Sequence, residues 1–351
     1  MVSADITAIK DTITMPLSSL VESLEIISLD NRDEALFQYG NVFLSDNHIG
    51  ISTTNPRSFK LFDRKGKYLR DIGREGRGPG EYLMIYSAAI DEKSETVYIL
   101  PWNATEMLAF GIDGTIKNSV KLAYKAPKSV FNLNSDGTIS FAVVPVGNTP
   151  VWAWTQDREG NVVNKIANPK AGQPIDFNSE ITAGKNTGEF DPFLLMYGNE
   201  SNDALSRYNV GAGKTEPIFT VKNIQQKKPP YYSYTQLPNH FIGNYTPGME
   251  QVGEHAFAGL PPVHFIIDKE TLQGAYYKLV MDELGDMGAW PSFSQGYFIS
   301  NMAAIHFKAE LEKLLSSGRV ADKAMLDKIT ALDNSLNEED NNVIILGRLK
   351  K

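Results

Sequence analysis

The sequence predicts an all-β fold, a β-propeller, from three observations: a repeated glycine turn, short strand-like segments between the turns, and little helical periodicity between residues 24 and 305. The turns lie at Gly66, Gly114, Gly160 and Gly213, so the successive spacings are 48, 46 and 53 residues. About four strands in each ~45 residues matches the size and strand number of a propeller blade. A β-sandwich, or a pair of sandwiches, is the alternative, and the near-constant spacing favours the propeller.

Each repeated unit has the pattern of a β-hairpin. An aromatic residue precedes the glycine, together with an aspartate in the first three units, and a strand-like segment of alternating polarity follows. Glycine is expected at these turns because it readily adopts the positive φ that other residues avoid. The units read "FKLFDRKGKYLRDIG", "MLAFGIDGTIKNSVKL", "VWAWTQDREGNVVNKI" and "ALSRYNVGAGKTEPIFTV", and further strand candidates lie at 96–100, 130–133 and 139–144.

Two amphipathic helices are predicted near the C-terminus, at about 306–337. Phe307, Leu311, Leu314 and Leu315 share one helical face, and Gly318 is well placed to end that helix. A second apolar set follows at positions 325, 329, 332 and 336, with intervals of 4, 3 and 4. These positions predict a helical insertion inside the otherwise all-β chain.

The strand-like segment "VIILGRL" follows the predicted helices at 343–349. A strand this late in the chain predicts that the two termini close the ring together, with "SLEIISL" at 23–29 as the N-terminal partner. Closure of this kind removes exposed sheet edges. The expected organisation is an N-terminal arm over residues 1–19 and a single propeller over residues 20–351.

Composition narrows the class of function. The chain has 351 residues, of which 42% are hydrophobic and 22% charged, which is typical of a globular protein with a substantial core. A net charge of −8 argues against nucleic-acid and anionic-membrane partners, because both bind basic surfaces. The absence of cysteine excludes disulfides, thiolate metal ligands and a cysteine nucleophile. No run of 18 apolar residues occurs, so no membrane-spanning helix is expected.

No linear motif predicts catalysis. The five histidines lack the i, i+2 and i, i+4 spacings of metal pairs, and HExxH, Gly-x-Ser-x-Gly and the sialidase Asp-box are all absent. We therefore predict no catalytic residue, no metal ligand and no cofactor. A calcium site built from Asp, Asn and Glu of several blades has no linear signature, so a lactonase-type enzyme stays open.

Residues 60–100 resemble a known family, the six-bladed, TolB-like β-propellers of unknown function that are abundant in Bacteroides-type bacteria. The family shows a Phe-Asp-x-x-Gly-Lys hairpin, a Gly-x-Gly-Pro-Gly-Glu-Tyr loop and a strand pair beginning with Asp. The chain's end, "NEEDNNVIILGRLK", is similar to the family's closing strand, although Val343 follows Asn342 directly, without the family's usual proline. The matching positions are Phe62, Asp63, Gly66, Lys67, Gly76, Gly78, Pro79, Gly80, Glu81, Tyr82, Asp91 and Tyr98.

The resemblance implies six blades and a place outside the cytoplasm, but no established activity. Family members usually carry an exported, often lipoprotein-type N-terminus, whose anchor cysteine would precede this sequence. The segment "MVSADITAIKDT" has no signal-peptide features, which by itself fits either a cytosolic protein or a trimmed export signal. Together these points predict a periplasmic or cell-surface protein held by an N-terminal anchor.

The glycine-rich segment "DIGREGRGPGEY" at 71–82 is the first candidate site. It does not match a phosphate-binding loop, because it lacks a Gly-Lys-Ser/Thr ending and no predicted helix follows it. The favoured interpretation is a shaped connection in which Arg77 or Glu81 bonds neighbouring backbone. In the alternative, Arg74, Arg77 and Glu81 reach the mouth of the central channel and bind a ligand.

The second candidate site is "KKPPYYSYTQLPNHF" at 227–241. Tyr231, Tyr232 and Tyr234 could stack against a sugar or a peptide, since aromatic rings offer a large contact area at low entropic cost. Packing of these rings against the next blade is the favoured interpretation.

The sequence thus predicts an extracytoplasmic propeller, expected to be a monomer, that binds a ligand or another protein without catalytic machinery. The partner is an unidentified small molecule, glycan or protein, and a role in glycan or peptide handling is suggested. The alternative is a hydrolase or lyase with a metal or carboxylate site at the mouth of the central channel.

Overall fold

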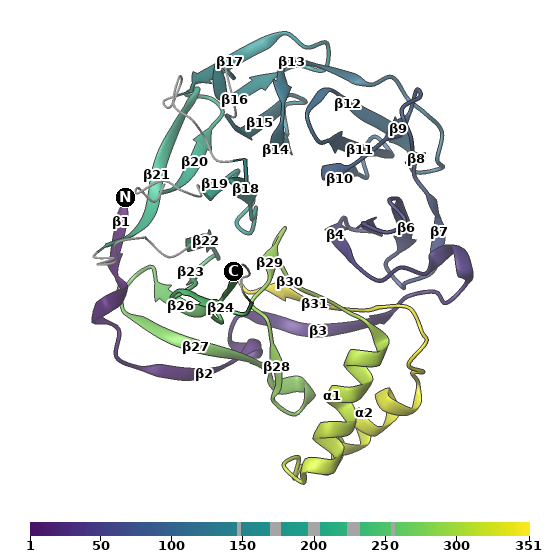
Figure 1. Cartoon of the computed structure of the whole chain (residues 1–351), viewed down its shortest axis with the longest axis vertical. Coiled ribbons are helices and arrows are strands. Elements are labelled where there is room, and N and C mark those ends of the chain that lie inside the picture. The colour runs from purple at the N-terminus through teal and green to yellow at the C-terminus, as the bar shows by residue number, and fades with distance from the viewer. Residues whose placement is uncertain (146–148, 169–176, 196–203, 223–231, 254–256) are drawn as a thin grey trace.

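A computed structural model of the chain describes residues 1–145, 149–168, 177–195, 204–222, 232–253 and 257–351. Six blades surround a central axis, which confirms the predicted six-bladed propeller over the alternative of β-sandwiches (Figure 1). The innermost strand of each blade lines the axis, and the outermost strand forms the wall of the ring.

Blades 1 to 3 are four-stranded antiparallel sheets that follow one another along the chain. Blade 1 comprises β4 (Gly40–Leu44), β5 (His48–Thr53), β6 (Phe59–Asp63) and β7 (Tyr68–Asp71). Blade 2 comprises β10 (Ile85–Asp91), β11 (Thr96–Pro101), β12 (Ala104–Gly111) and β13 (Val120–Ala126). Blade 3 comprises β14 (Lys128–Leu133), β15 (Ile139–Val144), β16 (Val151–Gln156) and β17 (Val162–Ala167).

Blades 4 and 5 each gain a parallel outer strand from the N-terminus. These strands, β1 (Val2–Asp5) and β2 (Thr12–Pro16), pair with β21 and β27 and so cover two sheet edges. Blade 4 holds β18 (Glu180–Ala183), β19 (Pro192–Leu195), β20 (Leu205–Asn209) and β21 (Lys214–Lys222). Blade 5 holds β22 (Tyr232–Gln236), β23 (His240–Tyr245), β26 (Val263–Asp268), β27 (Gly274–Met281) and the short β28 (Met287–Ala289).

Blade 6 closes the ring from both ends of the chain, as predicted. It consists of β29 (Phe293–Ser294), β30 (Tyr297–Met302), β31 (Val343–Leu349) and β3 (Val21–Ser28). The N-terminal β3 pairs antiparallel with the C-terminal β31, in a register that places Ile26 opposite Ile345. Two buried asparagines secure this closure: Asn341 Nδ2 donates to the carbonyls of Asp30 and Ala35, both at 3.0 Å, and Asn342 Nδ2 donates to Asn301 Oδ1 at 2.8 Å.

The predicted helical insertion lies between β30 and β31. It consists of α1 (Ala304–Ser317) and α2 (Lys323–Asn334), and Gly318 ends α1 in the left-handed conformation with φ +64°. The apolar faces of both helices pack on the junction of blades 5 and 6, where Phe307, Leu311 and Ile329 are buried. Neither helix is long and apolar enough to cross a membrane, and no other helix in the described part of the chain is.

Shorter elements connect the blades. The 3-10 helices are η1 (Ile6–Ala8), η2 (Leu17–Ser19), η3 (Asp33–Ala35) and η4 (Asp282–Leu284). Two small strand pairs lie outside the blades: β8 (Arg74–Glu75) with β9 (Glu81–Tyr82), and β24 (Met249–Gln251) with β25 (Phe257–Gly259).

In each of blades 1 to 4, the predicted glycine turn joins the third and fourth strands counted from the axis. In blade 1, Asp63 Oδ1 accepts the backbone N–H groups of Lys65 and Lys67 at 2.9 and 3.0 Å, and Gly66 adopts φ +86°. Blade 5 contains a fifth turn of this kind that the glycine spacing did not reveal. There Asp268 Oδ1 accepts the N–H of Thr271 at 2.7 Å, and Leu272 takes the positive φ (+57°).

The core is divided into six apolar clusters, and each lies between two neighbouring blades. Blades 2 and 3 meet around Trp154 and Phe141, whose rings stack with centroids 4.8 Å apart. Blades 4 and 5 meet around Phe219 and Phe241, which stack at 4.5 Å. Most of the large apolar residues pack between the blades, and the axis is lined by a mixture of polar and apolar side chains.

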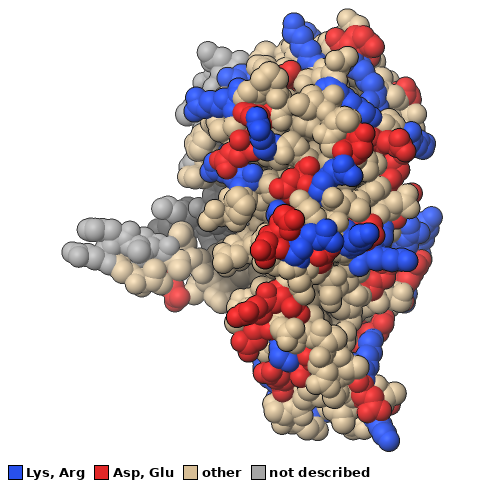
Figure 2. Space-filling view, turned by 90° about the vertical axis from the view of Figure 1, so that its right-hand side faces the viewer, with Lys and Arg blue, Asp and Glu red and all other residues tan. Residues whose placement is uncertain are grey.

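The outer wall of the ring is charged but has no patch of one sign on the side formed by blades 1 and 2. Lysine and arginine side chains alternate there with aspartate and glutamate (Figure 2). This mixed surface agrees with the modest net charge of −8.

Candidate functional site

A cavity of about 700 Å³ occupies the axis of the propeller. Its wall comes from the inner strands of all six blades, and on one side it extends outward into the crevice between blades 5 and 6. The polar and aromatic residues of its wall include Asn41, Thr182, Ser233, Asn244, His264, Tyr277, Trp290 and Ser292.

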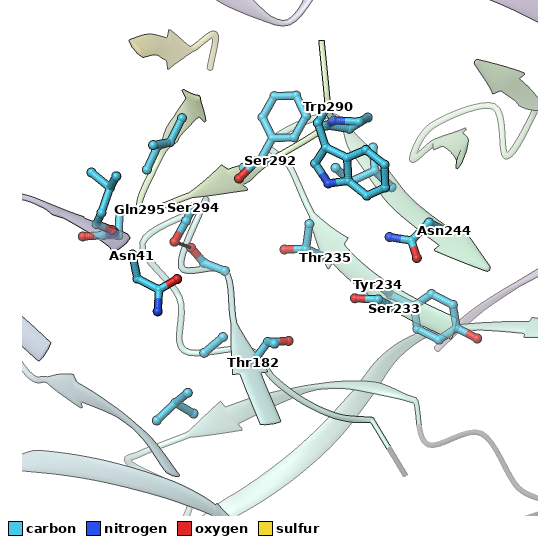
Figure 3. A pocket seen from close by; sticks show the side chains of 18 of the residues that line it. Asn41, Thr182, Ser233, Tyr234, Thr235, Asn244, Trp290, Ser292, Ser294 and Gln295 are labelled. Carbon is cyan, nitrogen blue, oxygen red and sulfur yellow. Dashed lines mark hydrogen bonds between the residues drawn. The ribbon is translucent and has the colours of Figure 1, made fainter. Parts of the chain in front are cut away.

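The cavity wall combines polar and apolar side chains and carries no formal charge from the described residues. Its polar side chains are hydroxyls, amides and one imidazole, and no Asp, Glu, Lys or Arg lines it. Thr182 of blade 4, Ser233 and Thr235 of blade 5, and Ser292 before β29 direct their hydroxyls toward the same central space (Figure 3). Hydroxyls and amides each offer both donors and acceptors, so the wall is suited to a neutral polar ligand.

Some of these polar groups already have protein partners. Thr235 Oγ1 accepts from Asn186 Nδ2 at 3.2 Å, and Gln295 Oε1 accepts the backbone N–H of Leu44 at 3.0 Å. Such bonds tie the inner strands of blades 1, 4, 5 and 6 to one another and make the cavity wall rigid.

Other polar groups of the wall make no hydrogen bond to the described part of the chain. Apart from the Tyr277 hydroxyl, which is completely buried, they remain available to water or to a ligand. Their side chains are those of Asn41, Ser87, Thr182, Ser233, Asn244, His264, Tyr277, Ser292 and Ser300.

Four of these free groups form a row across blade 5. Ser233, Asn244 and His264 are direct cross-strand partners on β22, β23 and β26, and Tyr277 lies on the adjoining strand β27. Trp290 lies beside the row, with its ring edge-to-face with His264 and 4.7 Å between ring centroids. The Trp290 side chain is 61% exposed, so it offers an open aromatic face at the mouth of the cavity.

Burial controls the protonation of the two titratable groups in this row. Desolvation lowers the pKa of His264 below its usual value, so the imidazole is neutral at pH 7. Desolvation likewise raises the pKa of Tyr277, whose buried hydroxyl has no partner among the described residues. Both groups are thus uncharged, and each can donate a hydrogen bond.

A charged cluster lies where the inner strands of blades 2, 3 and 4 begin. Glu180 accepts a hydrogen bond from the Tyr86 hydroxyl, and Lys128 Nζ lies 2.5 Å from the other carboxylate oxygen. The Lys128 ammonium also lies 5.0 Å from the ring centroid of Phe177, which packs edge-on against the exposed Trp102. Of this cluster only Tyr86 reaches the cavity wall.

The glycine-rich loop lies at the outer rim of the ring, where β8 and β9 join blades 1 and 2 (Figure 1). Arg74 Nε and Glu81 Oε1 form an ion pair at 2.7 Å, and Glu81 Oε2 accepts the N–H of Gly78 at 2.7 Å. The Arg77 side chain is exposed, and none of the three predicted residues lines the cavity. Glu81 therefore bonds backbone of its own loop, while the role of these residues in ligand binding stays a prediction.

The tyrosine segment divides between described and undescribed residues. Tyr231 lies outside the described residues. Tyr232 and Tyr234 are 3% and 2% exposed and pack among the aromatic rings between blades 4 and 5. The Tyr234 ring contributes to the cavity wall but points away from its centre (Figure 3).

Apart from Tyr234, the residues that line the cavity were not predicted from the sequence. Asn41, Thr182, Asn244 and Trp290 come from four separate regions of the chain, and each has neighbours of ordinary strand composition. Asn41 and Thr182 lie on inner strands, Asn244 lies on the second strand of blade 5, and Trp290 lies just before β29, so only the fold brings them to one cavity.

The wall provides little that could hold a cation. Among the described residues no group of three His, Cys, Asp or Glu side chains is placed to bind a metal ion. The cavity contains one histidine and several oxygen-bearing side chains, which is a donor set suited to hydrogen bonding.

Comparison with solved structures identifies two similar chains. An exported-protein candidate from Bacteroides fragilis NCTC 9343 has a TM-score of 0.64 at 16% identity, covering 98% of this chain and 99% of that one. A member of the DUF4221 family from Bacteroides vulgatus ATCC 8482 has a TM-score of 0.51 at 11% identity, covering 94% and 97%. At such low identities these matches establish a shared fold only. No curated protein matches the sequence.

The sequence itself matches one family over almost its whole length. Residues 2–348 fit the family described as a domain of unknown function, DUF4934. This match includes every blade, both N-terminal outer strands and the helical insertion. The chain therefore belongs to the DUF4934 family of six-bladed β-propellers.

Proposed function

We propose that this protein is an extracytoplasmic binding propeller whose central cavity takes a hydroxyl-rich ligand, a short saccharide. The observation that carries the proposal is the row of unpartnered neutral groups on blade 5, Ser233, Asn244, His264 and Tyr277, beside the exposed ring of Trp290. Sugars present alternating donors and acceptors together with apolar faces. Amides, hydroxyls and an aromatic ring are complementary to both.

The size and rigidity of the cavity support the same proposal. A volume of about 700 Å³ falls within the usual range for small-molecule sites. The bonds between inner strands hold the wall in place before a ligand arrives, so little ordering entropy is lost on binding. A hydrolase or lyase would need an acid and a base aimed into the cavity; the described wall contains no carboxylate, and its candidates for proton transfer are one histidine and tyrosines.

Calorimetric titration with a panel of neutral mono- and oligosaccharides tests the proposal. We expect Asn244→Ala to weaken binding about 3- to 10-fold, since one or two hydrogen bonds are lost. Trp290→Ala should weaken it by a similar factor through loss of ring contact. Chromatography of the sugar after incubation distinguishes binding from turnover: an unchanged sugar supports a binding protein, and shorter or unsaturated products would indicate the hydrolase or lyase.

Two variants provide matched controls. Trp102 is 40% exposed but outside the cavity wall, so Trp102→Ala should bind as the unsubstituted protein does. Arg77→Ala tests the glycine-rich loop. Unchanged binding leaves the loop a structural connection, whereas lost binding at an unchanged melting temperature would make Arg74, Arg77 and Glu81 part of the site.

We also infer that the protein acts in the periplasm or at the cell surface, held by a lipid anchor. The support is the resemblance of residues 60–100 to exported TolB-like propellers and the similarity to the exported-protein candidate of Bacteroides fragilis. Fractionation of the source cells, with metabolic labelling by a fatty acid, tests this. Recovery of the unlabelled protein in the cytosol would contradict it.

A further inference from the structure

One lysine close to the cavity has no hydrogen-bond or ion-pair partner among the described residues. Lys185 follows Gly184, which belongs to the cavity wall, in the turn after the inner strand β18. The turn is fixed, because the Gly184 carbonyl accepts the N–H of Gln295 at 2.7 Å. Lys185 itself adopts φ +54°, a left-handed conformation that is uncommon outside glycine and is often found at functional sites.

The Lys185 side chain crosses from blade 4 to blade 3. Its Nζ lies 5.5 Å from the ring centroid of Phe131, on the inner strand β14, and the neighbouring Val130 lines the cavity. Lys185 is partly exposed to solvent and lies between Gly184 and the strand that carries Val130, two residues of the cavity wall, although it is not itself one of the lining residues. An aromatic face stabilises a cation without neutralising it.

Other lysines that are largely buried in the ring have ion-pair or hydrogen-bond partners, which Lys185 lacks among the described residues. Lys60 pairs with Asp71 at 3.2 Å, and Lys128 pairs with Glu180 at 2.5 Å. Lys269 Nζ donates to the carbonyls of Leu237 and Pro238 at 2.6 and 3.1 Å. Lys185 makes no ion pair or hydrogen bond within the described part of the chain, and the neutral cavity wall supplies no counter-charge. Burial alone lowers the pKa of its ammonium to about 8.

A half-buried cation with no counter-charge is costly to retain. The cost is recovered when a ligand supplies the missing negative charge. We propose that Lys185 forms an anion subsite beside the cavity and that the ligand is an acidic saccharide, a uronate, whose carboxylate meets this ammonium. The proposal rests on the proposed function, since the hydroxyl-binding row holds the remainder of the sugar.

The charge of the subsite favours a carboxylate over a phosphate monoester. A single ammonium matches a single negative charge, whereas doubly charged groups are usually held by several cations or by bidentate arginine. No arginine lines the cavity among the described residues.

The test is a titration with two matched pairs of sugars, glucose with glucuronate and galactose with galacturonate, at pH 7. The unsubstituted protein should bind the uronate of at least one pair about tenfold more tightly than its neutral partner, because a charge-assisted bond is added. Lys185→Met should lose this preference and keep the affinity for the neutral sugar within about twofold.

The pH dependence provides an independent measurement. The ammonium is charged below its pKa, so the preference for the uronate should be full at pH 6.5 and should fall as pH rises through about 8. In Lys185→Arg the preference should persist to about pH 9.5, because a guanidinium stays charged there. Acetic anhydride at pH 7.5 should modify Lys185 faster than the exposed Lys10, and glucuronate should protect Lys185.

The possible failures are distinguishable. Equal affinity for the acidic and neutral sugar in the unsubstituted protein overturns the anion subsite and leaves the saccharide proposal standing. Loss of neutral-sugar binding in Lys185→Met together with a lower melting temperature identifies a structural lysine and also overturns the subsite. If no sugar of either pair and no larger saccharide binds the unsubstituted protein, both proposals are wrong.

Discussion

At the scale of single residues, Tyr82 explains the glycine-rich loop better than its charged side chains do. Its buried hydroxyl accepts the N–H of Phe59 at 2.9 Å and donates to the carbonyl of Ile72 at 2.8 Å. A Cβ on Gly73 would lie 2.8 Å from the Tyr82 ring, so a side chain there would collide with it. The hydroxyl thus ties the loop to blade 1, and the Tyr82 ring packs in the apolar cluster between blades 1 and 2.

Replacement of Tyr82 by phenylalanine tests this anchoring role. We expect a loss of about 1–3 kcal/mol in the free energy of unfolding, because the substitution leaves two buried backbone groups without a partner. Urea denaturation measures the effect. Tyr39→Phe, at an exposed position, is the control and should change stability by less than about 0.5 kcal/mol. Equal stability of the two variants would contradict the anchoring role.

At the scale of the element, a capping aspartate is common to the outer hairpins of blades 1, 2, 3 and 5, and Asn209 replaces it in blade 4. The pKa of Asp113 is lowered mainly by a hydrogen bond from Thr115, that of Asp157 by one from Asn161, and that of Asp268 by the N–H of Thr271. Each carboxylate closes the turn between the two outer strands of its blade. The charged form is the one that accepts these bonds, which makes the turns sensitive to acid.

Acid titration tests the turns. A carboxyl whose pKa is lowered in the folded state adds stability above its unfolded pKa of about 3.9, and that stability is lost as pH falls through the folded value. The urea midpoint should therefore fall steeply between about pH 4 and pH 2. Asp157→Asn should flatten this slope, and Asp33→Asn, which lies outside these turns, should leave it unchanged. Identical slopes in the two variants would contradict the role of the turn.

At the scale of the whole molecule, stability depends on closing the ring. Strand β31 lies between β30 and β3, and Ile344, Ile345 and Leu346 are completely buried in it. Each face of β31 contributes to a different interblade cluster, one shared with blade 5 and one shared with blade 1. Loss of this strand would expose two sheet edges and two apolar faces at once.

Removal of residues 343–351 tests ring closure. We expect a loss of several kcal/mol, because three fully buried aliphatic side chains alone contribute about 1.5–3 kcal/mol each. Calorimetry should show a much lower melting temperature or no cooperative transition. Deletion of the exposed Lys351 alone is the control. If the shortened chain melts at the same temperature as the intact one, β31 does not close the ring.

The sequence by itself determined the repeat, the ring closure and the helical insertion. These features depend on short-range rules: positive φ at Gly66 or Gly318, aspartate capping of a turn, and apolar periodicity in α1 and α2. Such rules act over a few residues and can be read in order along the chain. The turn at Leu272 escaped because glycine was taken as the marker, while the feature shared by blades 1, 2, 3 and 5 was the aspartate; in blade 4, Asn209 Oδ1 takes its place and accepts the N–H of Ala212.

Only the tertiary structure decided where a ligand could bind. Asn41, Thr182, Asn244 and Trp290 are ordinary residues of separate segments, and the ring alone gathers them around one cavity. Likewise the lack of a partner for Lys185 depends on what blades 3, 5 and 6 place around it, which no local pattern contains. Local propensity and turn chemistry act within one blade, whereas cavity shape, desolvation and charge pairing arise between residues far apart in sequence.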